Sequence, residues 1–213
     1  MIINDLKYWN FYYNRSNSLV KNSNFAAFIK KKILKKKFNI LEIGTGNGRD
    51  AYYLSKFSNS VIAIDQSKTA INENKLKTQK LAIKNLDFKR LNVNNILNIP
   101  NKKKINLIYA RFFLHSINLQ KENRLLLNLK KFNKSKLNVA LEFRTIQDEL
   151  MNKGKKISKF ETYTDHYRRF IDADKFEKKL TNLGFKIIYK KVGINLSKTK
   201  NDNPHLCRII FRN

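Results

Sequence analysis

Asn39-Ile40-Leu41-Glu42-Ile43-Gly44-Thr45-Gly46-Asn47-Gly48-Arg49-Asp50 is the stretch that decides the fold. An apolar run rich in β-forming residues predicts a strand that ends at Ile43. Three glycines spaced G-x-G-x-G follow, and the next residues, 50–55, are compatible with a helix. Glycine suits a turn in which the backbone takes a positive φ or a ligand lies against it. The stretch therefore predicts a strand, a tight turn and a helix, and a place for a nucleotide-like ligand.

A second signal follows at the distance that a nucleotide site requires. Residues 60–64 predict another strand, and this strand ends in Asp65, about 20 residues past the first glycine. An acidic residue at this place can bind the hydroxyl groups of a ribose. The spacing favours a nucleotide site, and an ordinary βαβ turn is the alternative.

The glycine spacing also points to a family. The third glycine comes one residue too early for the dinucleotide pattern G-x-G-x-x-G, and Glu42 stands two residues before the first glycine. In this the sequence resembles the class I S-adenosylmethionine-dependent methyltransferases, whose first motif is an acidic residue followed by G-x-G-x-G. The resemblance implies S-adenosylmethionine as cofactor and S-adenosylhomocysteine as product. It further implies that Glu42 and the glycine loop hold the methionine end and that Asp65 holds the ribose.

A third cofactor contact departs from the family pattern. Residues 86–91 predict the third strand, and the family commonly has an acid after it, which contacts the adenine amino group. Asn92 occupies that place, and its carbonyl oxygen can still accept a hydrogen bond. The expected cofactor-binding residues are Glu42, Gly44, Thr45, Gly46, Gly48, Asp65, Gln66, Asn92 and Arg111.

The composition describes a folded but very basic chain. Its 213 residues suit one domain, and 42% of them are hydrophobic. Lys and Arg number 45 against 16 Asp and Glu, a formal charge of +29 that invites a nucleic-acid partner. Because the charge is mostly lysine spread along the chain, we interpret it chiefly as solvated surface.

Two absences set further expectations. The sequence has no apolar run of 18 residues and no signal-peptide pattern, so we expect a cytoplasmic protein without membrane insertion. A single cysteine, Cys207, excludes an internal disulfide and a cysteine-based metal cluster, and we expect no metal site. Cys207 is expected in a strand, as a small buried hydrophobic residue.

The N-terminal part predicts two helices. Residues 4–14 form an aromatic-rich helical candidate, and residues 1–37 together are expected to be a helical cap segment. In similar methyltransferases such a segment closes over the cofactor pocket, which places Tyr8, Trp9, Tyr12 or Tyr13 near the cofactor. Simple anchoring of the helix to the core is the alternative. Ser23 is expected to cap the second helix, which begins at Asn24.

The middle of the chain continues the pattern of strands and helices. Ser67 is expected to cap a helix over residues 68–79, and residues 105–110 and 137–144 predict the fourth and fifth strands. In open parallel sheets ligands bind at the carboxyl ends of the strands, which makes Arg111, His115 and Arg144 candidate site residues. For His115, a hydrogen bond within the core is the alternative.

The connection from Arg144 to about Asp172 is long for a compact domain, which predicts a lid or binding loop at residues 144–171. It contains T-D-H-Y-R-R-F, in which adjacent arginines can bind a phosphate or carboxylate and a histidine beside a carboxylate can act as a base. The candidate catalytic residues are His166, His115 and Asp165, and the candidate acceptor-binding residues are Tyr12, Arg144, Tyr167, Arg168 and Arg169. The alternative is a surface loop in which Arg168 and Arg169 pair with Asp165, Asp172 or Asp174.

The C-terminal part completes a recognisable sheet. Residues 172–183 predict a helix ended by Gly184, and the strands over 185–189 and 206–211 are joined too closely for a crossover helix, so they should pair antiparallel. The resemblance implies an α/β fold over residues 38–213. Its Rossmann-like seven-stranded sheet is expected in the order 3-2-1-4-5-7-6, with the last strand antiparallel and helices on both faces.

These observations predict a methyltransferase that acts on a small molecule. The Y-W-N-x-x-Y opening, the R-F-F-L-H-S-I stretch and the T-D-H-Y-R-R-F segment are similar to bacterial methyltransferases encoded among surface-polysaccharide genes. This resemblance implies O-methylation of a small anionic or sugar-type acceptor, such as a sugar or a phosphorylated precursor. The alternatives are an RNA methyltransferase, which the charge favours, and a non-catalytic cofactor-binding protein. Against the RNA enzyme, the fourth strand is followed by A-R-F-F and not by N/D-P-P-Y/F.

Overall fold

The structure is a computed structural model that describes residues 5–14, 21–34, 38–132 and 137–213. Parts of the predicted cap segment, namely residues 1–4, 15–20 and 35–37, therefore lie outside the described residues. The chain divides into two compact units, Met1–Tyr109 and Ala110–Asn213, and each has its own packing. In the described ranges, no helix is both long enough and apolar enough for a membrane span.

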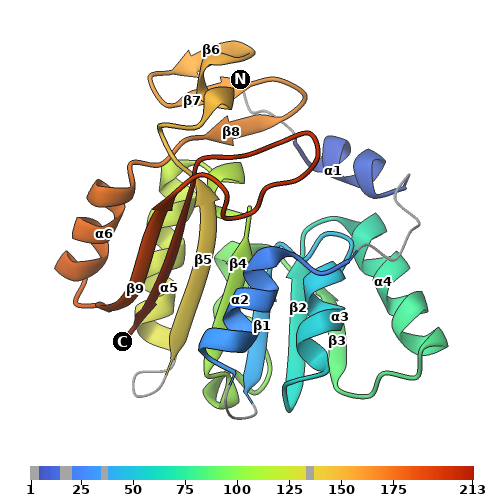
Figure 1. The fold of residues 1–213 in the computed structure, drawn as a ribbon. Helices are drawn as coiled ribbons and strands as arrows, with labels where there is room; N and C mark the ends of the chain where they lie inside the picture. The colour runs from blue at the N-terminus through green and yellow to red at the C-terminus, as the bar shows by residue number, and fades with distance from the viewer. Residues whose placement is uncertain (1–4, 15–20, 35–37, 133–136) are drawn as a thin grey trace. The chain divides into compact units, whose positions relative to one another are not determined.

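A mixed seven-stranded sheet has the strand order β3-β2-β1-β4-β5-β10-β9 (Figure 1). β1 pairs parallel with β2 and β4, and β2 pairs parallel with β3, whereas β10 pairs antiparallel with β5 and β9. The predicted strand order is confirmed, because the sixth and seventh predicted strands correspond to β9 and β10. The strands of this sheet are β1 (Asn39–Ile43), β2 (Ser60–Asp65), β3 (Leu86–Arg90), β4 (Leu107–Arg111), β5 (Asn138–Arg144), β9 (Lys186–Gly193) and β10 (Leu206–Arg212).

Serine side chains cap two helices of the first unit. The predicted caps are confirmed, because Ser23 Oγ accepts the Ala26 N–H at 3.0 Å and Ser67 Oγ accepts the Ala70 N–H at 3.2 Å. α4 packs on β2 and β3, and α1 packs on α4. The helical segments are α1 (Asp5–Asn14), α2 (Asn24–Lys32), α3 (Arg49–Ser55), α4 (Lys68–Lys80), and the short 3₁₀ turns η1 (Val93–Asn98) and η2 (Lys102–Lys104).

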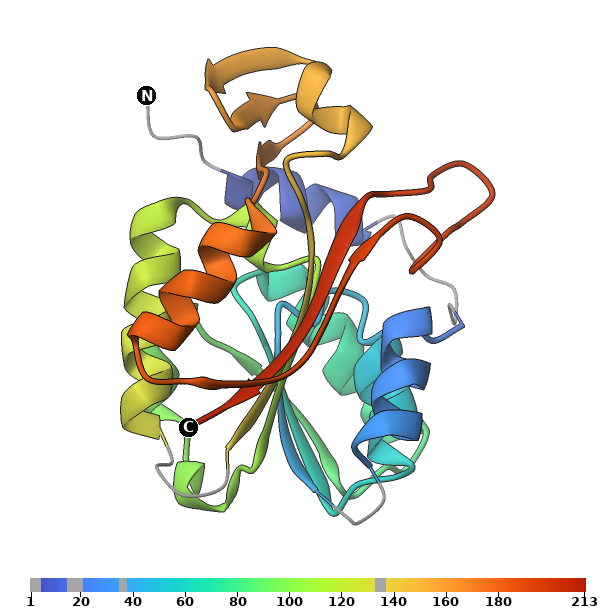
Figure 2. The same cartoon turned by 60° about the vertical axis from the view of Figure 1, so that its left-hand side comes forward.

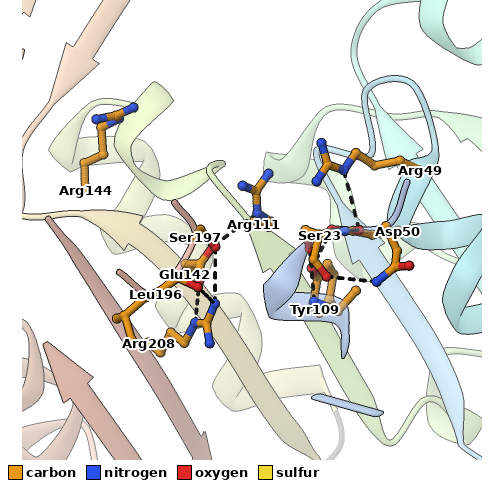
Figure 3. A network of polar contacts seen from close by, with 12 residues as sticks. Ser23, Arg49, Asp50, Tyr109, Arg111, Glu142, Arg144, Leu196, Ser197 and Arg208 are labelled. Carbon is orange, nitrogen blue, oxygen red and sulfur yellow. Dashed lines mark hydrogen bonds and ion pairs between the residues drawn. The ribbon is translucent and has the colours of Figure 1, made fainter. Parts of the chain in front are cut away.

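A buried carboxylate ties α2 to the helix that follows the glycine loop. Asp50, in the first turn of α3, accepts hydrogen bonds from the backbone N–H and the hydroxyl of Ser23, both at 2.7 Å, and from the Tyr109 hydroxyl at 2.6 Å (Figure 3). Its three donors satisfy most of the acceptor capacity of the carboxylate. Asp50 therefore holds the start of α3, and with it the end of the glycine loop, against β4.

The second unit contains the expected last helix and the antiparallel strands. Asp172 caps α6, Gly184 follows its end with a φ of 79°, and α6 packs along β9 (Figure 2). Cys207 is buried in β10, as expected. The remaining helical segments are η3 (Leu114–Ser116), α5 (Leu119–Phe132), η4 (Glu149–Asn152) and α6 (Ala173–Asn182).

The long connection after β5 is not a structureless loop. It forms a small antiparallel sheet in the order β6-β7-β8, with β6 at Lys155–Ser158, β7 at Glu161–Tyr163 and β8 at Tyr167–Arg169 (Figure 1). These strands are three or four residues long, and β6 is exposed at every position. Such short and polar strands lack the alternation by which a strand is recognised, which is why the sequence predicts only a loop there.

Candidate functional site

The glycine loop has the backbone that its sequence predicts. Gly44, Gly46 and Gly48 all have positive φ values, of 72°, 55° and 74°. The N–H groups of Gly44 and Thr45 both donate to the Ile64 carbonyl, at 2.9 and 3.1 Å, which ties the loop to β2. The loop therefore runs from β1 across the end of β2, where Asp65 lies.

Asp65 lies at the end of β2 and contacts the loop. One carboxylate oxygen accepts the Gly46 N–H at 3.0 Å and the other accepts the Ser67 N–H at 2.9 Å. Burial raises the pKa of Asp65, and these backbone donors oppose the shift. A carboxylate can accept about four hydrogen bonds, so Asp65 retains acceptor capacity for the hydroxyl groups of a ligand.

Glu42 is a buried acid beneath the same loop. Its Oε2 accepts the Thr45 hydroxyl at 3.1 Å, and its Oε1 has no hydrogen-bond donor among the residues that the structure describes. Burial, and then the nearby Asp50, raise the pKa of Glu42 well above its usual range. A cation bound beside Glu42 opposes both effects, because it stabilises the ionised carboxylate.

Two residues outside the glycine motif contact the loop. Asn74 of α4 donates from Nδ2 to the Gly46 carbonyl at 2.8 Å, and its Oδ1 lies 2.4 Å from where a Cβ on Gly48 would be. Tyr13 of α1 has its hydroxyl 2.4 Å from the corresponding position on Gly46. Both glycines are therefore required for close packing as well as for their φ values. Asn74 carries no recognisable signal in a chain so rich in asparagine, whereas Tyr13 is one of the four aromatic residues expected near the cofactor.

The other expected cofactor and cap residues are more peripheral. Gln66 is exposed, and Tyr12 is 51% exposed on α1, where its ring contacts those of Tyr8, Trp9 and Tyr13. Asn92 accepts the Asn94 N–H at 3.0 Å and so caps η1. Their contacts with a ligand stay predictions.

In the second unit, a buried glutamate joins two arginines. Glu142 of β5 accepts from Arg111 Nε at 3.1 Å and from Arg208 Nε at 2.5 Å, one on each oxygen, and also from the Ser197 hydroxyl at 2.9 Å (Figure 3). These contacts bring together the ends of β4 and β5 and the strand β10. Arg111 was expected at the site, but its pairing with Glu142, and through it with Arg208, was not, because these residues lie far apart in the sequence.

Arg144 and His115 have protein partners. Arg144 donates to both oxygens of Asp148, at 2.9 and 2.7 Å, and also to Asp202. His115 accepts the backbone N–H of Arg144 on Nδ1 at 3.2 Å, so its proton is on Nε2. Burial, followed by the charge of Arg144, lowers the pKa of His115 well below its usual range. The geometry agrees with the alternative in which His115 satisfies a hydrogen bond within the core.

The T-D-H-Y-R-R-F segment brings His166, Asp165 and Arg168 together. His166 Nδ1 lies 3.1 Å from an Asp165 carboxylate oxygen, and Arg168 donates to the same oxygen at 2.8 Å. Burial and the charge of Arg168 lower the pKa of His166 to about 4, which leaves the imidazole neutral at pH 7. Tyr167 instead donates to Glu161 at 2.6 Å.

Both arginines of the segment were expected to bind one ligand, but Arg169 has protein partners. Its guanidinium donates to the buried carboxylate of Glu122 and to the Ile117 carbonyl. Successive side chains of a strand point to opposite faces, so Arg168 and Arg169 on β8 reach different partners. Arg169 anchors β8 to α5, and Arg168 pairs with Asp165 as the surface-loop alternative has it. Among the described residues, no three His, Cys, Asp or Glu side chains gather to form a metal site.

Comparisons with known proteins place the chain in a family. The family described as "Methyltransferase domain" matches residues 34–183. No curated protein gives a match. Similar folds occur in a SAM-dependent methyltransferase from Methanosarcina mazei (18% identity over 86% of this chain and 95% of that chain, TM-score 0.72) and in one from Aquifex aeolicus (20% identity, 97% of both chains, TM-score 0.65). A DhpI–SAH complex is also similar (14% identity, 98% of this chain and 94% of that chain, TM-score 0.66). Because the family match covers most of the chain, this protein belongs to the methyltransferase domain family.

Proposed function

We propose that the protein transfers a methyl group from S-adenosylmethionine to an oxygen of a small anionic or sugar-type acceptor. The observation that carries the proposal is a glycine loop with two acidic residues next to it. Glu42 precedes the loop, and Asp65 accepts a hydrogen bond from its middle glycine. The similarity of segments of the sequence to methyltransferases of surface-polysaccharide genes supports a sugar or sugar precursor as acceptor.

The residues of the first unit suit this cofactor. Asp65 has acceptor capacity left for ribose hydroxyl groups, and Glu42 offers an oxygen without a donor to a cationic group such as an ammonium or sulfonium. A bound cation lowers the electrostatic cost of keeping Glu42 ionised in its buried position. When bound, the cofactor supplies an electrophilic methyl group whose sulfide leaving group needs no proton.

The residues of the second unit suit an acceptor with a hydroxyl group and a negative charge. A hydroxyl loses its proton during methylation, and the imidazole of His166, which is neutral at pH 7, is the proposed acceptor of that proton. Asp165 lies beside the imidazole and stabilises it once it is protonated. Arg111 and Arg168 supply positive charge for an anionic group.

RNA is the second candidate acceptor, because the formal charge of +29 favours a polyanion. A non-catalytic cofactor-binding protein is the third candidate. The experiment incubates the purified protein with methyl-labelled S-adenosylmethionine and a cell extract separated into a small-molecule fraction and an RNA fraction. We expect label in small molecules, absent with Asp65→Ala. RNase-sensitive label supports the RNA enzyme, and no label in either fraction supports the non-catalytic protein.

A further inference from the structure

Arg111 is held by one edge of its guanidinium. Its Nε donates to Glu142 at 3.1 Å, and the side chain is 16% exposed. Its terminal nitrogens, Nη1 and Nη2, make no hydrogen bond within the described parts of the chain. Figure 3 shows these two nitrogens directed away from Glu142. Because Nε is fixed, the free end keeps a constant direction and presents a planar fork of N–H donors.

The charges around Glu142 do not balance. Arg208 is 8% exposed, donates to the same carboxylate, and makes further hydrogen bonds to the Leu196 carbonyl and the Ser197 hydroxyl (Figure 3). One negative charge is thus shared by two positive ones, which leaves the group of Arg111, Glu142 and Arg208 with a net charge of +1. The surplus resides at Arg111, since Arg208 is enclosed by protein acceptors.

Phe112 supports the guanidinium of Arg111. The ring centroid of Phe112 lies 3.9 Å from the Arg111 Cζ, and the residue has a φ of 55°, which is uncommon and costly for a bulky side chain. Its N–H donates to the Glu142 carbonyl at 2.8 Å, which fixes this backbone. Strained residues that the surroundings hold in place concentrate at binding sites.

The neighbouring arginine does not offer a comparable fork. The Cζ of Arg144 lies 5.6 Å from the ring centroid of Phe112, but the charge of Arg144 is met by Asp148 and Asp202. Arg111, Glu142 and Arg208 together carry a surplus of one positive charge, which a single negative charge balances. A carboxylate carries one negative charge, whereas a phosphate monoester carries nearly two at pH 7.5, since its second pKa is about 6.

We propose that the free end of Arg111, which was expected from the sequence to bind the cofactor, instead binds a carboxylate group of the methyl acceptor, with the ring of Phe112 beside it. The two terminal nitrogens match the two oxygens of a carboxylate in a bidentate pair. The inference rests on the proposed function and makes it narrower, because it selects a carboxylate-bearing acceptor over a phosphorylated one.

The test measures binding of three small probes to the intact protein by ligand-observed NMR at constant ionic strength and pH 7.5. Benzoate carries the carboxylate, benzamide is its neutral counterpart and phenyl phosphate is the dianion. We expect benzoate to bind about tenfold more tightly than either of the others. Tighter binding of phenyl phosphate, equal binding of benzamide, or no binding of benzoate overturns the proposal.

Variants assign the binding to Arg111. Arg111→Gln is expected to weaken benzoate binding about tenfold, and Arg111→Lys, which keeps the charge but loses the fork, to weaken it by a smaller factor. The matched control is Arg124→Gln, because Arg124 is exposed on α5. Thermal melting shows whether each variant is folded, and unchanged benzoate binding by folded Arg111→Gln overturns the assignment. Binding of S-adenosylhomocysteine, measured on the same samples, tests the proposed function separately from the carboxylate site.

Discussion

Replacing Glu142 by glutamine should destabilise the protein strongly. The variant keeps the shape of the side chain but removes the negative charge that Arg111 and Arg208 share. It also puts an amide NH₂ where one carboxylate oxygen accepts a hydrogen bond, so one arginine faces a donor instead of an acceptor. The variant therefore leaves buried positive charge uncompensated.

The magnitude follows from how buried the three side chains are. Glu142 has no exposed side-chain surface, and Arg208 has 8%. Removing one partner of a buried ion pair costs about 3–5 kcal/mol. Arg111 can partly turn to water, so we expect the lower end, about 3 kcal/mol, which for a chain of this size lowers the melting temperature by about 6–12 °C.

The assay is thermal and urea unfolding followed by far-UV circular dichroism at pH 7.5. Asp174→Asn is the matched control, because the Asp174 side chain is 90% exposed and pairs with Lys190 at the surface. The control should change stability by less than about 0.5 kcal/mol. The double variant Glu142→Gln/Arg208→Met removes the stranded charge and should recover part of the loss. A loss below about 1 kcal/mol for Glu142→Gln, or no recovery in the double variant, would refute the reasoning.

Three further predictions concern the two sites. Glu42→Gln should raise the melting temperature, because the raised pKa of Glu42 shows that its ionised form is unfavourable in the buried position. The same variant should bind S-adenosylmethionine more weakly in calorimetry. A variant less stable than the wild-type protein contradicts this prediction. Asn74→Ala leaves the Gly46 carbonyl without its donor and should weaken cofactor binding about tenfold, whereas the exposed neighbour Asn72→Ala should not; equal affinities would exclude a role for Asn74. The pKa of His166, about 4 when folded against about 6.5 when unfolded, means that the unfolded chain binds a proton first as pH falls. Lowering the pH from 6.5 to 4 should therefore cost up to about 3 kcal/mol of stability, and His166→Asn should lose less in urea unfolding; the same loss in both proteins contradicts the shift.

The sequence was sufficient for features that depend on neighbouring residues. Ser23 and Ser67 cap helices through hydrogen bonds to residues three positions ahead, and that spacing is visible in the sequence. The alternation of strands with helices and the antiparallel pairing of the last two strands also follow from local patterns, whereas the order of the strands in the sheet was implied by the resemblance to class I methyltransferases. Asp65 could be found for the same reason, because its distance from the glycines is fixed by one helix and one strand.

The sequence was insufficient where distant residues decide the outcome. The partner of Arg169 is Glu122, 47 positions earlier, and the partner of Arg111 is Glu142, 31 positions later. No local pattern distinguishes an arginine that a buried acid will neutralise from one whose donors stay available. The sequence therefore predicted Arg144 and Arg168 alike as residues that bind the methyl acceptor, although Arg144 is paired with both Asp148 and Asp202.

The most direct test of the account is calorimetric titration of the purified protein with S-adenosylmethionine. The account predicts saturable one-to-one binding, weakened at least about tenfold by Asp65→Ala, which removes the acceptor beside the glycine loop. The matched control is Asp87→Ala, because Asp87 is 54% exposed on β3 and pairs only with Lys89 among the described residues. Absence of binding by the wild-type protein, or equal affinity of the Asp65 and Asp87 variants, contradicts the central claim that this loop holds the methyl donor.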